Sequence, residues 1–405
     1  MTIQRESYLS QIRPFLGTPF IKVLMGIRRC GKSTILELLR DELLAAGVTP
    51  EHIIYISLET REDLITPGDL SAAIKKKLPG AGKAYILLDE VQMIPGWERT
   101  INAFFAGKRA EIFITGSNSM MLSTELSTLL AGRYVSFTIR PLSFAEYLAF
   151  TRDLRNIPTG NGASFIGEYL RLGGFPGMHY ARNMDSAFVY KAVYDIFSTI
   201  VLKDVLWRNH LRNTDLLERL IKFLFDTSGS IVSARNISDY FKNQGRKVSV
   251  DTILEYIAAL ESAYTIEKVR RYDIKGKRLL DLREKYYAAD ISLIHALLGY
   301  DDQRLPGLME TVIYGELRRR GYEVFTGQYD DREIDFVCLK GGEKIYIQAV
   351  SMIHNDQRVI DREFGNLLKI PDQYPKYVVS LDERWTSTVE GVRHQYLPDF
   401  LLNGP

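Results

Sequence analysis

The sequence predicts an α/β protein whose first third forms a parallel β-sheet covered by helices. Short runs rich in Ile, Val, Leu, Tyr and Phe alternate with helical segments there. The runs lack the polar alternation of a strand with one face in water, so both faces are expected to be covered. Glycine and proline separate the runs, as at Pro79–Gly82. The expected strands are Ile21–Met25, Ile53–Leu58, Ala84–Leu88, Glu111–Thr115 and Tyr134–Ile139.

Length and composition narrow the class of protein. A chain of 405 residues suggests two or three domains. The formal net charge of +2 gives no global attraction to nucleic acid or membrane. Two cysteines, Cys30 and Cys338, do not indicate a disulfide framework. The first residues lack the apolar run of a signal peptide, and no apolar stretch is long enough to span a bilayer. We therefore expect a cytoplasmic protein with no membrane partner.

The segment Gly26–Ser33 fits the phosphate-binding pattern G-x-x-x-x-G-K-[ST]. An expected strand precedes it and the helical segment Thr34–Arg40 follows, which is the required order. Backbone amides and the helix N-terminus are expected to bind the phosphates of a nucleoside triphosphate, with Lys32 neutralising their charge and Ser33 ligating Mg²⁺. The alternative is a glycine turn in a structural βα unit. The expected nucleotide-binding residues are Gly26, Arg28, Arg29, Cys30, Gly31, Lys32, Ser33 and Thr34.

Two acidic residues end the third expected strand. The apolar run Tyr85–Leu88 is followed by Asp89 and Glu90, which is the Walker B pattern. We expect Asp89 to hold the Mg²⁺ shell and Glu90 to orient or deprotonate the attacking water. The alternative is two solvated acids at a strand end.

Further polar residues flank the last two expected strands. Ser117 and Asn118 follow the fourth strand. In ATPases with an extra strand between the Walker motifs, a polar side chain here contacts the γ-phosphate and the lytic water, a role expected for Asn118 or Ser117. The alternative is a turn closed by local hydrogen bonds. Arg133, before the fifth strand, is a candidate to stabilise transition-state charge, in its own site or a neighbour's. Its alternative is a surface salt bridge.

On these segments the sequence resembles prokaryotic AAA-type ATPases that carry a C-terminal conserved domain of unknown function. The resemblance implies ATP rather than GTP, and it supports a role for Arg133. It also implies a winged helix and a nuclease-like fold in the tail. The stretches that carry the resemblance are Gly26–Ser33, Leu87–Gln92, Ile114–Ser119, Leu130–Tyr134, Pro141–Tyr147 and Gly173–Pro176.

Four segments are therefore expected. They are an AAA-type ATPase core at 1–150, a helical lid or linker region at 151–228, a winged helix at 229–283 and a nuclease-like α/β domain at 284–405. In the third segment, two helices precede a hairpin formed by Tyr264–Arg271 and Arg278–Leu282. The winged helix is expected to contact either DNA or a protein. Its basic residues are Lys268, Arg270, Arg271, Lys275, Lys277 and Arg278.

The tail departs from the pattern of active PD-(D/E)xK nucleases. Such sites need an acid at one strand end and an acid-x-lysine triplet on the next strand. Glu310 and Asp335 are present, but the triplet reads Gln348-Ala349-Val350, without acid or lysine. We expect a restriction-endonuclease-like fold without nuclease activity.

The sequence as a whole predicts an AAA-type ATPase that hydrolyses Mg-ATP to drive a conformational change on DNA or on a partner protein. The alternative is a slowly hydrolysing nucleotide switch, with the tail as a protein-interaction module in signalling or defence. AAA-type enzymes often form rings, so the protein is a candidate homo-oligomer. Either role is compatible with such an assembly.

Overall fold

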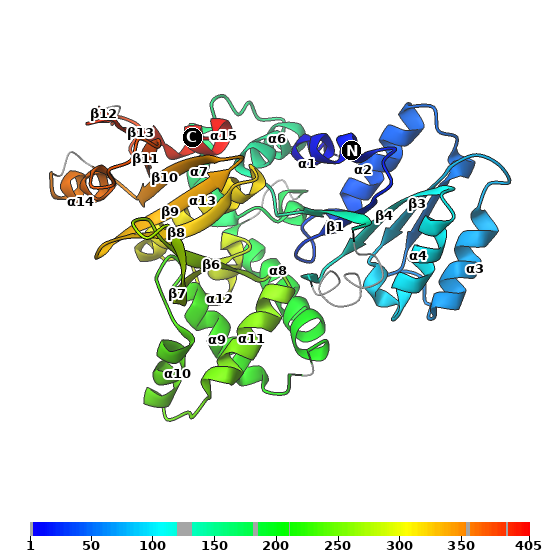
Figure 1. Ribbon diagram of the computed structural model, residues 1–405, viewed down its shortest axis with the longest axis horizontal. Coiled ribbons are helices and arrows are strands. Elements are labelled where there is room, and N and C mark those ends of the chain that lie inside the picture. Colours follow the sequence, from blue (N-terminus) through cyan, green and yellow to red (C-terminus); the bar gives the residue numbers. More distant parts are fainter. Residues whose placement is uncertain (1–2, 120–131, 181–184, 210, 354–356, 386–387) are drawn as a thin grey trace. The chain divides into compact units, whose positions relative to one another are not determined.

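The structure is a computed structural model that describes residues 3–119, 132–180, 185–209, 211–353, 357–385 and 388–405. The chain divides into two compact units (Figure 1). One comprises Met1–Arg140 with Ser262–Tyr264, and the other comprises Pro141–Glu261 with Thr265–Pro405. Within the described ranges, no helix combines the length and apolar character needed to cross a membrane.

The first unit contains a five-stranded sheet in the order β2-β3-β4-β1-β5. Every neighbouring pair is parallel, which confirms the predicted parallel sheet. β4 lies between β1 and β3, so an extra strand does separate the strands that precede the two Walker motifs. The strands are β1 (Ile21–Met25), β2 (Ile53–Ser57), β3 (Ala84–Asp89), β4 (Ala110–Gly116) and β5 (Tyr134–Thr138).

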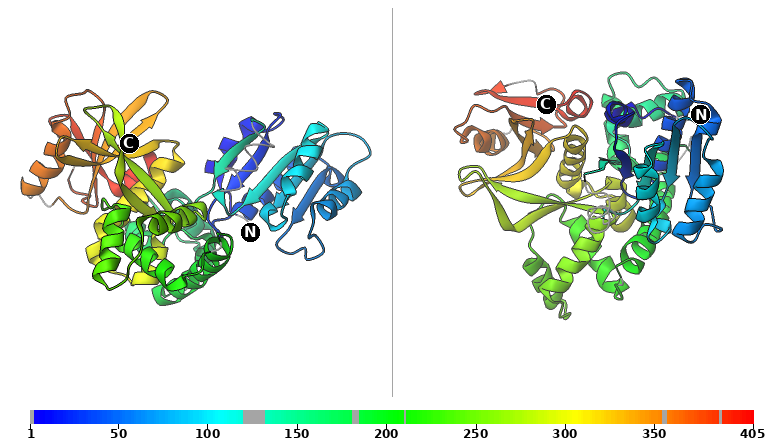
Figure 2. Two further views of the ribbon diagram at one scale, coloured as in Figure 1. Left: turned by 60° about the horizontal axis from the view of Figure 1, so that its bottom comes forward. Right: turned by 45° about the vertical axis from the view of Figure 1, so that its right-hand side comes forward.

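Helices cover both faces of this sheet (Figure 2). Alternate strand residues such as Val23 and Ile86 form one core with α3 and α4. Their neighbours Leu24 and Leu87 are also fully buried, on the face that contacts α2. Successive residues of a strand point to opposite faces of the sheet, and helices cover both faces here. Residues on both faces are therefore buried, which explains why the apolar runs are continuous. The helices are α1 (Glu6–Ile12), α2 (Lys32–Ala45), α3 (Pro67–Lys77) and α4 (Trp97–Ala106), with 3-10 turns at Arg13–Phe15, Pro50–His52 and Val91–Met93.

The second unit begins with a mostly helical region. α6 starts at a capping box in which Ser143 and Glu146 satisfy each other's backbone amides. The 3-10 segments are Ala163–Phe165, Pro176–Tyr180 and Asp302–Arg304, and Ile200–Trp207 is a π-helix. The helices are α6 (Phe144–Arg155), α7 (Ile166–Leu172), α8 (Ser186–Thr199), α9 (Thr214–Asp226), α10 (Ala234–Asn243), α11 (Val250–Ser262), α12 (Ile291–Leu298), α13 (Leu305–Arg319), α14 (Gln357–Leu368) and α15 (Leu397–Asn403).

An eight-stranded sheet in the order β12-β13-β11-β10-β9-β8-β6-β7 forms the rest of this unit. The expected hairpin corresponds to β6 and β7, and β6 also pairs in parallel with β8. The strands are β6 (Ile266–Asp273), β7 (Arg278–Ala288), β8 (Glu323–Tyr329), β9 (Arg332–Lys340), β10 (Glu343–Val350), β11 (Lys376–Ser380), β12 (Thr388–Val389) and β13 (Val392–Tyr396).

This sheet differs from the expected division of the tail at residues 283 and 284. β7 continues without interruption to Ala288, and the β6–β8 pairing joins the hairpin to the strands that follow. The hairpin therefore belongs to the same sheet as the strands β8 to β13 that follow it. Sequence periodicity did not show this because strand pairing between distant segments leaves no local pattern.

Two of the segments that carried the family resemblance meet inside the second unit. The amide of Leu142 donates to the carbonyl oxygen of Gly174 at 2.7 Å. The amide of Gly174 donates to Asp290 Oδ2 at 2.8 Å. A β-carbon at Gly173 would lie 2.1 Å from Asp290 Oδ1, so only glycine fits there. These residues therefore act in packing.

Candidate active site

Three loops converge at the carboxyl edge of the parallel sheet in the first unit. The glycine loop follows β1, Asp89 ends β3, and Ser117 follows β4. Because these strands are neighbours and parallel, the three loops lie side by side. The sheet thus brings together the Walker A residues, the Walker B residues and the polar pair Ser117 and Asn118.

The glycine loop has the backbone shape of a phosphate-binding loop. Gly26 and Gly31 have φ values of 147° and 101°, and α2 begins at Lys32. A β-carbon at Gly26 would lie 2.0 Å from the carbonyl oxygen of Ile139, so a larger residue would displace the loop. Cys30 Sγ lies 3.3 Å from the same oxygen. Burial raises the pKa of the Cys30 thiol, so this side chain acts as a neutral packing group.

Arg5 hydrogen-bonds to the backbone of this loop. Its Nη1 donates to the carbonyl oxygen of Cys30 at 2.7 Å, and its Nη2 donates to that of Arg140 at 2.9 Å. The guanidinium lies 4.7 Å from the centre of the Tyr8 ring, and Arg5 is 1% exposed. Sequence reasoning missed this residue because a single arginine far from the motif carries no signal.

The Arg5→Ala variant is expected to weaken both the loop and nucleotide binding. It removes two buried hydrogen bonds to backbone carbonyl oxygens, and each is expected to cost about 1–3 kcal/mol. The free energy of unfolding from urea denaturation and the affinity for an ATP analogue measure the two effects. Arg13→Ala is the matched control, because Arg13 pairs with Glu6 and Glu42 at the surface and its loss should cost about 0–1 kcal/mol. Equal stability and affinity in the two variants would contradict this role.

Lys32 lies inside the loop and is 3% exposed. Its Nζ donates to the carbonyl oxygens of Gly26 and Ile27 at 3.1 and 3.2 Å. The same Nζ lies 3.4 Å from Glu90 Oε1. The ammonium group is therefore held at the centre of the loop, where a phosphate would compete with Glu90 for it.

Asp89 and Ser33 form the pair of oxygens that suits magnesium. Asp89 Oδ1 accepts a hydrogen bond from Thr115 Oγ1 at 2.6 Å, and the Ser33 side chain also hydrogen-bonds to Asp89. Burial raises the pKa of Asp89, and these two hydrogen bonds oppose that shift. A carboxylate and a hydroxyl beside the phosphate loop are the hard oxygen ligands that Mg²⁺ prefers, so the residues present fit this ion.

Glu90 adopts a left-handed backbone conformation with φ 55°, and its side chain lies beside Lys32 and Gln92. Its amide donates to Thr115 Oγ1 at 2.8 Å. Its Oε2 accepts a short hydrogen bond from Gln92 Nε2, which lies 3.2 Å from Ser117 Oγ. Burial favours a higher pKa for Glu90, but Lys32 and Gln92 outweigh it and hold the pKa below its ordinary value. Glu90 is thus ionised, as a base must be.

Thr115 and Gln92 are two further residues that sequence reasoning missed. Thr115 links the two acids, since it donates to Asp89 and accepts from the Glu90 amide. Gln92 links Glu90 to Ser117. Each lies within a segment that the family resemblance covered, but side-chain contacts between strands cannot be read from one sequence.

The remaining predicted site residues differ in how exposed and how well paired their side chains are. Arg28 Nη1 lies 3.0 Å from Glu59 Oε1, so its charge is already paired. Arg29 is exposed, with a left-handed φ of 67°. Thr34 is half-buried in the first turn of α2. Asn118 is 6% exposed beside the 1% exposed Ser117.

The structure does not bring Arg133 to this site. Its backbone oxygen accepts from Ile21 at the start of β1, and Tyr134 pairs with Ile21. Arg133 is therefore at the amino-terminal edge of the sheet, a strand length of about 16 Å from the loop. There its Nη1 donates to Asn102 Oδ1 at 2.8 Å. Arg133 and the glycine loop therefore lie at opposite edges of this sheet, because parallel strands place the two ends of β1 there. Leu130 and Ala131 of this motif lie outside the described residues.

Comparisons with known proteins agree with this geometry. Residues 18–148 match a family described as an AAA domain, and residues 165–304 match a domain of unknown function. An uncharacterized protein of Haemophilus influenzae is 35% identical over 99% of this chain and 98% of its own length. An uncharacterized protein of Methanocaldococcus jannaschii is 26% identical over 81% of this chain and 74% of its own length.

Among solved structures, the chain is similar to a Walker-type ATPase of Pyrococcus abyssi. The TM-score is 0.53 at 16% identity, and the match covers 73% of this chain and 96% of that one. At this identity the similarity concerns the fold alone.

Proposed function

The chain belongs, with its Haemophilus influenzae relative, to the family of AAA-type P-loop ATPases, and we propose that it hydrolyses Mg-ATP to drive a conformational change on DNA or on a partner protein. The convergence of Lys32, Asp89 and Glu90 at one sheet edge carries this proposal. A phosphate-binding lysine, a magnesium ligand and an ionised carboxylate are what ATP hydrolysis requires.

Each residue has a role in this proposal. The loop amides and Lys32 bind the β- and γ-phosphates. Ser33 and Asp89 would hold magnesium, which supplies positive charge next to those phosphates. Glu90 orients and deprotonates the attacking water, and Asn118 or Ser117 contacts the γ-phosphate and that water.

The contacts of Glu90 favour a second candidate, the slowly hydrolysing switch. Lys32 and Gln92 both engage the Glu90 carboxylate. Before Glu90 can activate water, these contacts must give way. If the Gln92 contact persists with ATP bound, Glu90 cannot activate water, so the protein turns nucleotide over slowly and the second unit serves as an interaction module.

The charges of the hairpin support a protein partner more than DNA. Of its six predicted basic residues, four have polar partners within the chain, which reduces the charge available for phosphates. Lys268 lies between Glu261 and Glu284, and Arg271 donates to Gln328. Lys275 pairs with Asp330, and Arg278 with Asp273.

Steady-state ATP turnover with and without DNA separates the candidates. If the protein uses hydrolysis to act on DNA or on a partner protein, ATP turnover should rise when that DNA or partner is added. If the protein is a slowly hydrolysing switch, it should bind ATP tightly and show negligible turnover under all conditions. The same plasmid and single-stranded DNA samples, incubated with Mg²⁺ or Mn²⁺, are expected to remain intact because we propose that the nuclease-like segment is inactive. Cleavage that Asp335→Ala abolishes would contradict that part of the proposal.

Arg133 retains one role in this proposal. At the far edge of the sheet, it can reach a nucleotide only on a neighbouring copy of the chain. We therefore place it in a homo-oligomer, as a group that stabilises transition-state charge between subunits. The cytoplasmic location stays a prediction from the sequence.

A further inference from the structure

A buried lysine in the second unit lies among three carboxylates. Lys285, on β7, is fully buried. Its Nζ lies 2.8 Å from Glu310 Oε2, 3.1 Å from Asp335 Oδ1 and 2.7 Å from Glu333 Oε1. α13 supplies Glu310, while β9 supplies Glu333 and Asp335. Three elements thus meet at one ammonium group.

The surrounding hydrogen bonds fix the two buried carboxylates toward that point. Asp335 Oδ2 accepts from the Ala349 amide at 2.9 Å, which leaves Oδ1 for the lysine. Glu310 Oε2 also accepts from Tyr287 Oη at 2.8 Å. Glu310 is 9% exposed and Asp335 is 6% exposed. Carboxylates fixed in this way would repel one another without a cation between them.

The ammonium group excludes a divalent ion from the same point. A magnesium ion would need carboxylate oxygens at about 2.0–2.1 Å, which places it where the Lys285 Nζ now lies. The cation position is filled from within the chain.

We propose that the ammonium group of Lys285 replaces a divalent metal in this carboxylate cluster, so that the second unit folds without a metal and does not bind one there. This accounts for Gln348 and Val350 on β10. Gln348 Oε1 accepts from the Asp335 amide at 3.3 Å, as a structural group rather than a ligand. Lys285 on β7 supplies the positive charge of the cluster. A lysine at the position of Val350 on β10, where the nuclease triplet has one, is therefore not needed.

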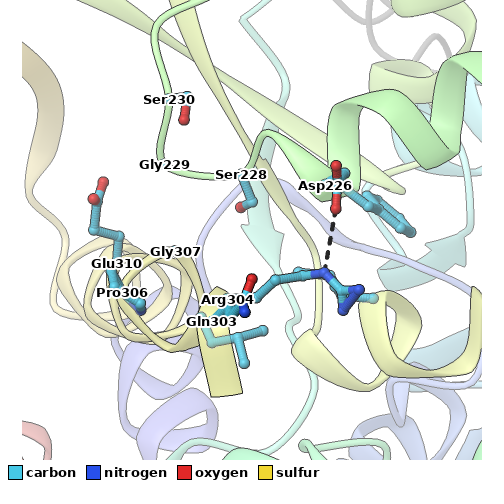
Figure 3. Close-up of a pocket in the computed structure, with 12 residues that line it drawn as sticks. Asp226, Ser228, Gly229, Ser230, Gln303, Arg304, Pro306, Gly307 and Glu310 are labelled. Carbon is cyan, nitrogen blue, oxygen red and sulfur yellow. Dashed lines mark hydrogen bonds and ion pairs between the residues drawn. The ribbon is translucent and has the colours of Figure 1, made fainter. Parts of the chain in front are cut away.

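A pocket gives solvent access to the cluster. Its volume is about 230 Å³, and Glu310 lines it together with Gly229, Ser230 and Arg304 (Figure 3). A β-carbon at Gly229 would lie 3.0 Å from Glu310 Oε1, so the carboxylate reaches the pocket wall. An ion from solution can therefore approach once the lysine is removed.

The test measures thermal unfolding of the full chain without nucleotide, in EDTA and in Mn²⁺. The wild-type melting temperature is expected to be equal in both. Lys285→Ala should lower it by about 10 °C in EDTA, because the carboxylates lose their cation. Mn²⁺ should restore much of that loss, and the restoration should vanish in the double variant Lys285→Ala/Asp335→Asn. Electron paramagnetic resonance of Mn²⁺ then counts one added site in Lys285→Ala.

Three outcomes would overturn the proposal. The first is a wild-type Mn²⁺ site that Asp335→Asn removes. The second is a folded Lys285→Ala variant that does not respond to Mn²⁺. The third is metal-dependent DNA cleavage that requires Lys285, which would make the lysine a catalytic group.

If Lys285→Ala does not fold in EDTA or in Mn²⁺, variants that neutralise the charges of the cluster test the proposal instead. Lys285→Met should be unstable, and Lys285→Met/Glu310→Gln/Asp335→Asn should regain stability because no buried charge remains uncompensated. A triple variant less stable than Lys285→Met would contradict the proposed charge compensation. None of these outcomes depends on ATP hydrolysis in the first unit.

Discussion

The Glu90→Gln variant is expected to bind Mg-ATP but to lose hydrolysis. The amide keeps the shape of the side chain but cannot take a proton from water, and loss of a general base costs about 10²–10⁴-fold in kcat. ATP affinity should be equal to or higher than that of the wild type, since Lys32 no longer has a carboxylate that competes with the phosphates. Single-turnover hydrolysis and equilibrium binding of labelled ATP measure the two quantities.

The matched control for this variant is Glu62→Gln, which changes an exposed glutamate in the same unit. It should hydrolyse ATP at the wild-type rate. A Glu90→Gln protein with wild-type kcat would show that another group activates the water, and the assignment of Glu90 would then be wrong.

The Lys32→Ala variant is expected to lose nucleotide binding. A charge-assisted hydrogen bond contributes about 1.5–3 kcal/mol, and contacts to two phosphates together correspond to a loss of about 100-fold or more in affinity. The variant also removes the ammonium that balances the buried Glu90 carboxylate. We therefore expect the first unit to be less stable as well.

Because instability alone could abolish binding, the Lys32 experiment needs two further proteins. Lys76→Ala removes an exposed lysine from α3 and should bind ATP normally. Lys32→Ala/Glu90→Gln removes both members of the ion pair, so it should regain stability without regaining affinity. Tight ATP binding by this double variant would contradict the role of Lys32.

Much of the first unit could be predicted from the sequence because its signals are local. The five strands of the parallel sheet lie where apolar runs predicted them, and Gly26–Gly31 forms the expected loop, with α2 beginning at Lys32. Asp89 and Glu90 lie at the end of β3, beside Lys32. Such elements depend on short-range periodicity and on a motif whose spacing is fixed by phosphate geometry.

The residues that the sequence did not reveal act through distant contacts. Arg5 donates to the carbonyl oxygens of Cys30 and Arg140, which lie 25 and 135 residues away in the sequence. Lys285 contacts Glu310 and Asp335 from a different strand. Arg133 shows the reverse case, since its place before β5 puts it at the sheet edge opposite the glycine loop. Side-chain direction and strand order decide these contacts, and neither follows from spacing along the chain.

Calorimetric titration of the wild-type protein with a magnesium-bound, non-hydrolysable ATP analogue tests the central claim most directly. The account predicts saturable heat at one nucleotide per chain, which Lys32→Ala abolishes. No heat, together with an unchanged melting temperature at saturating nucleotide, would contradict it.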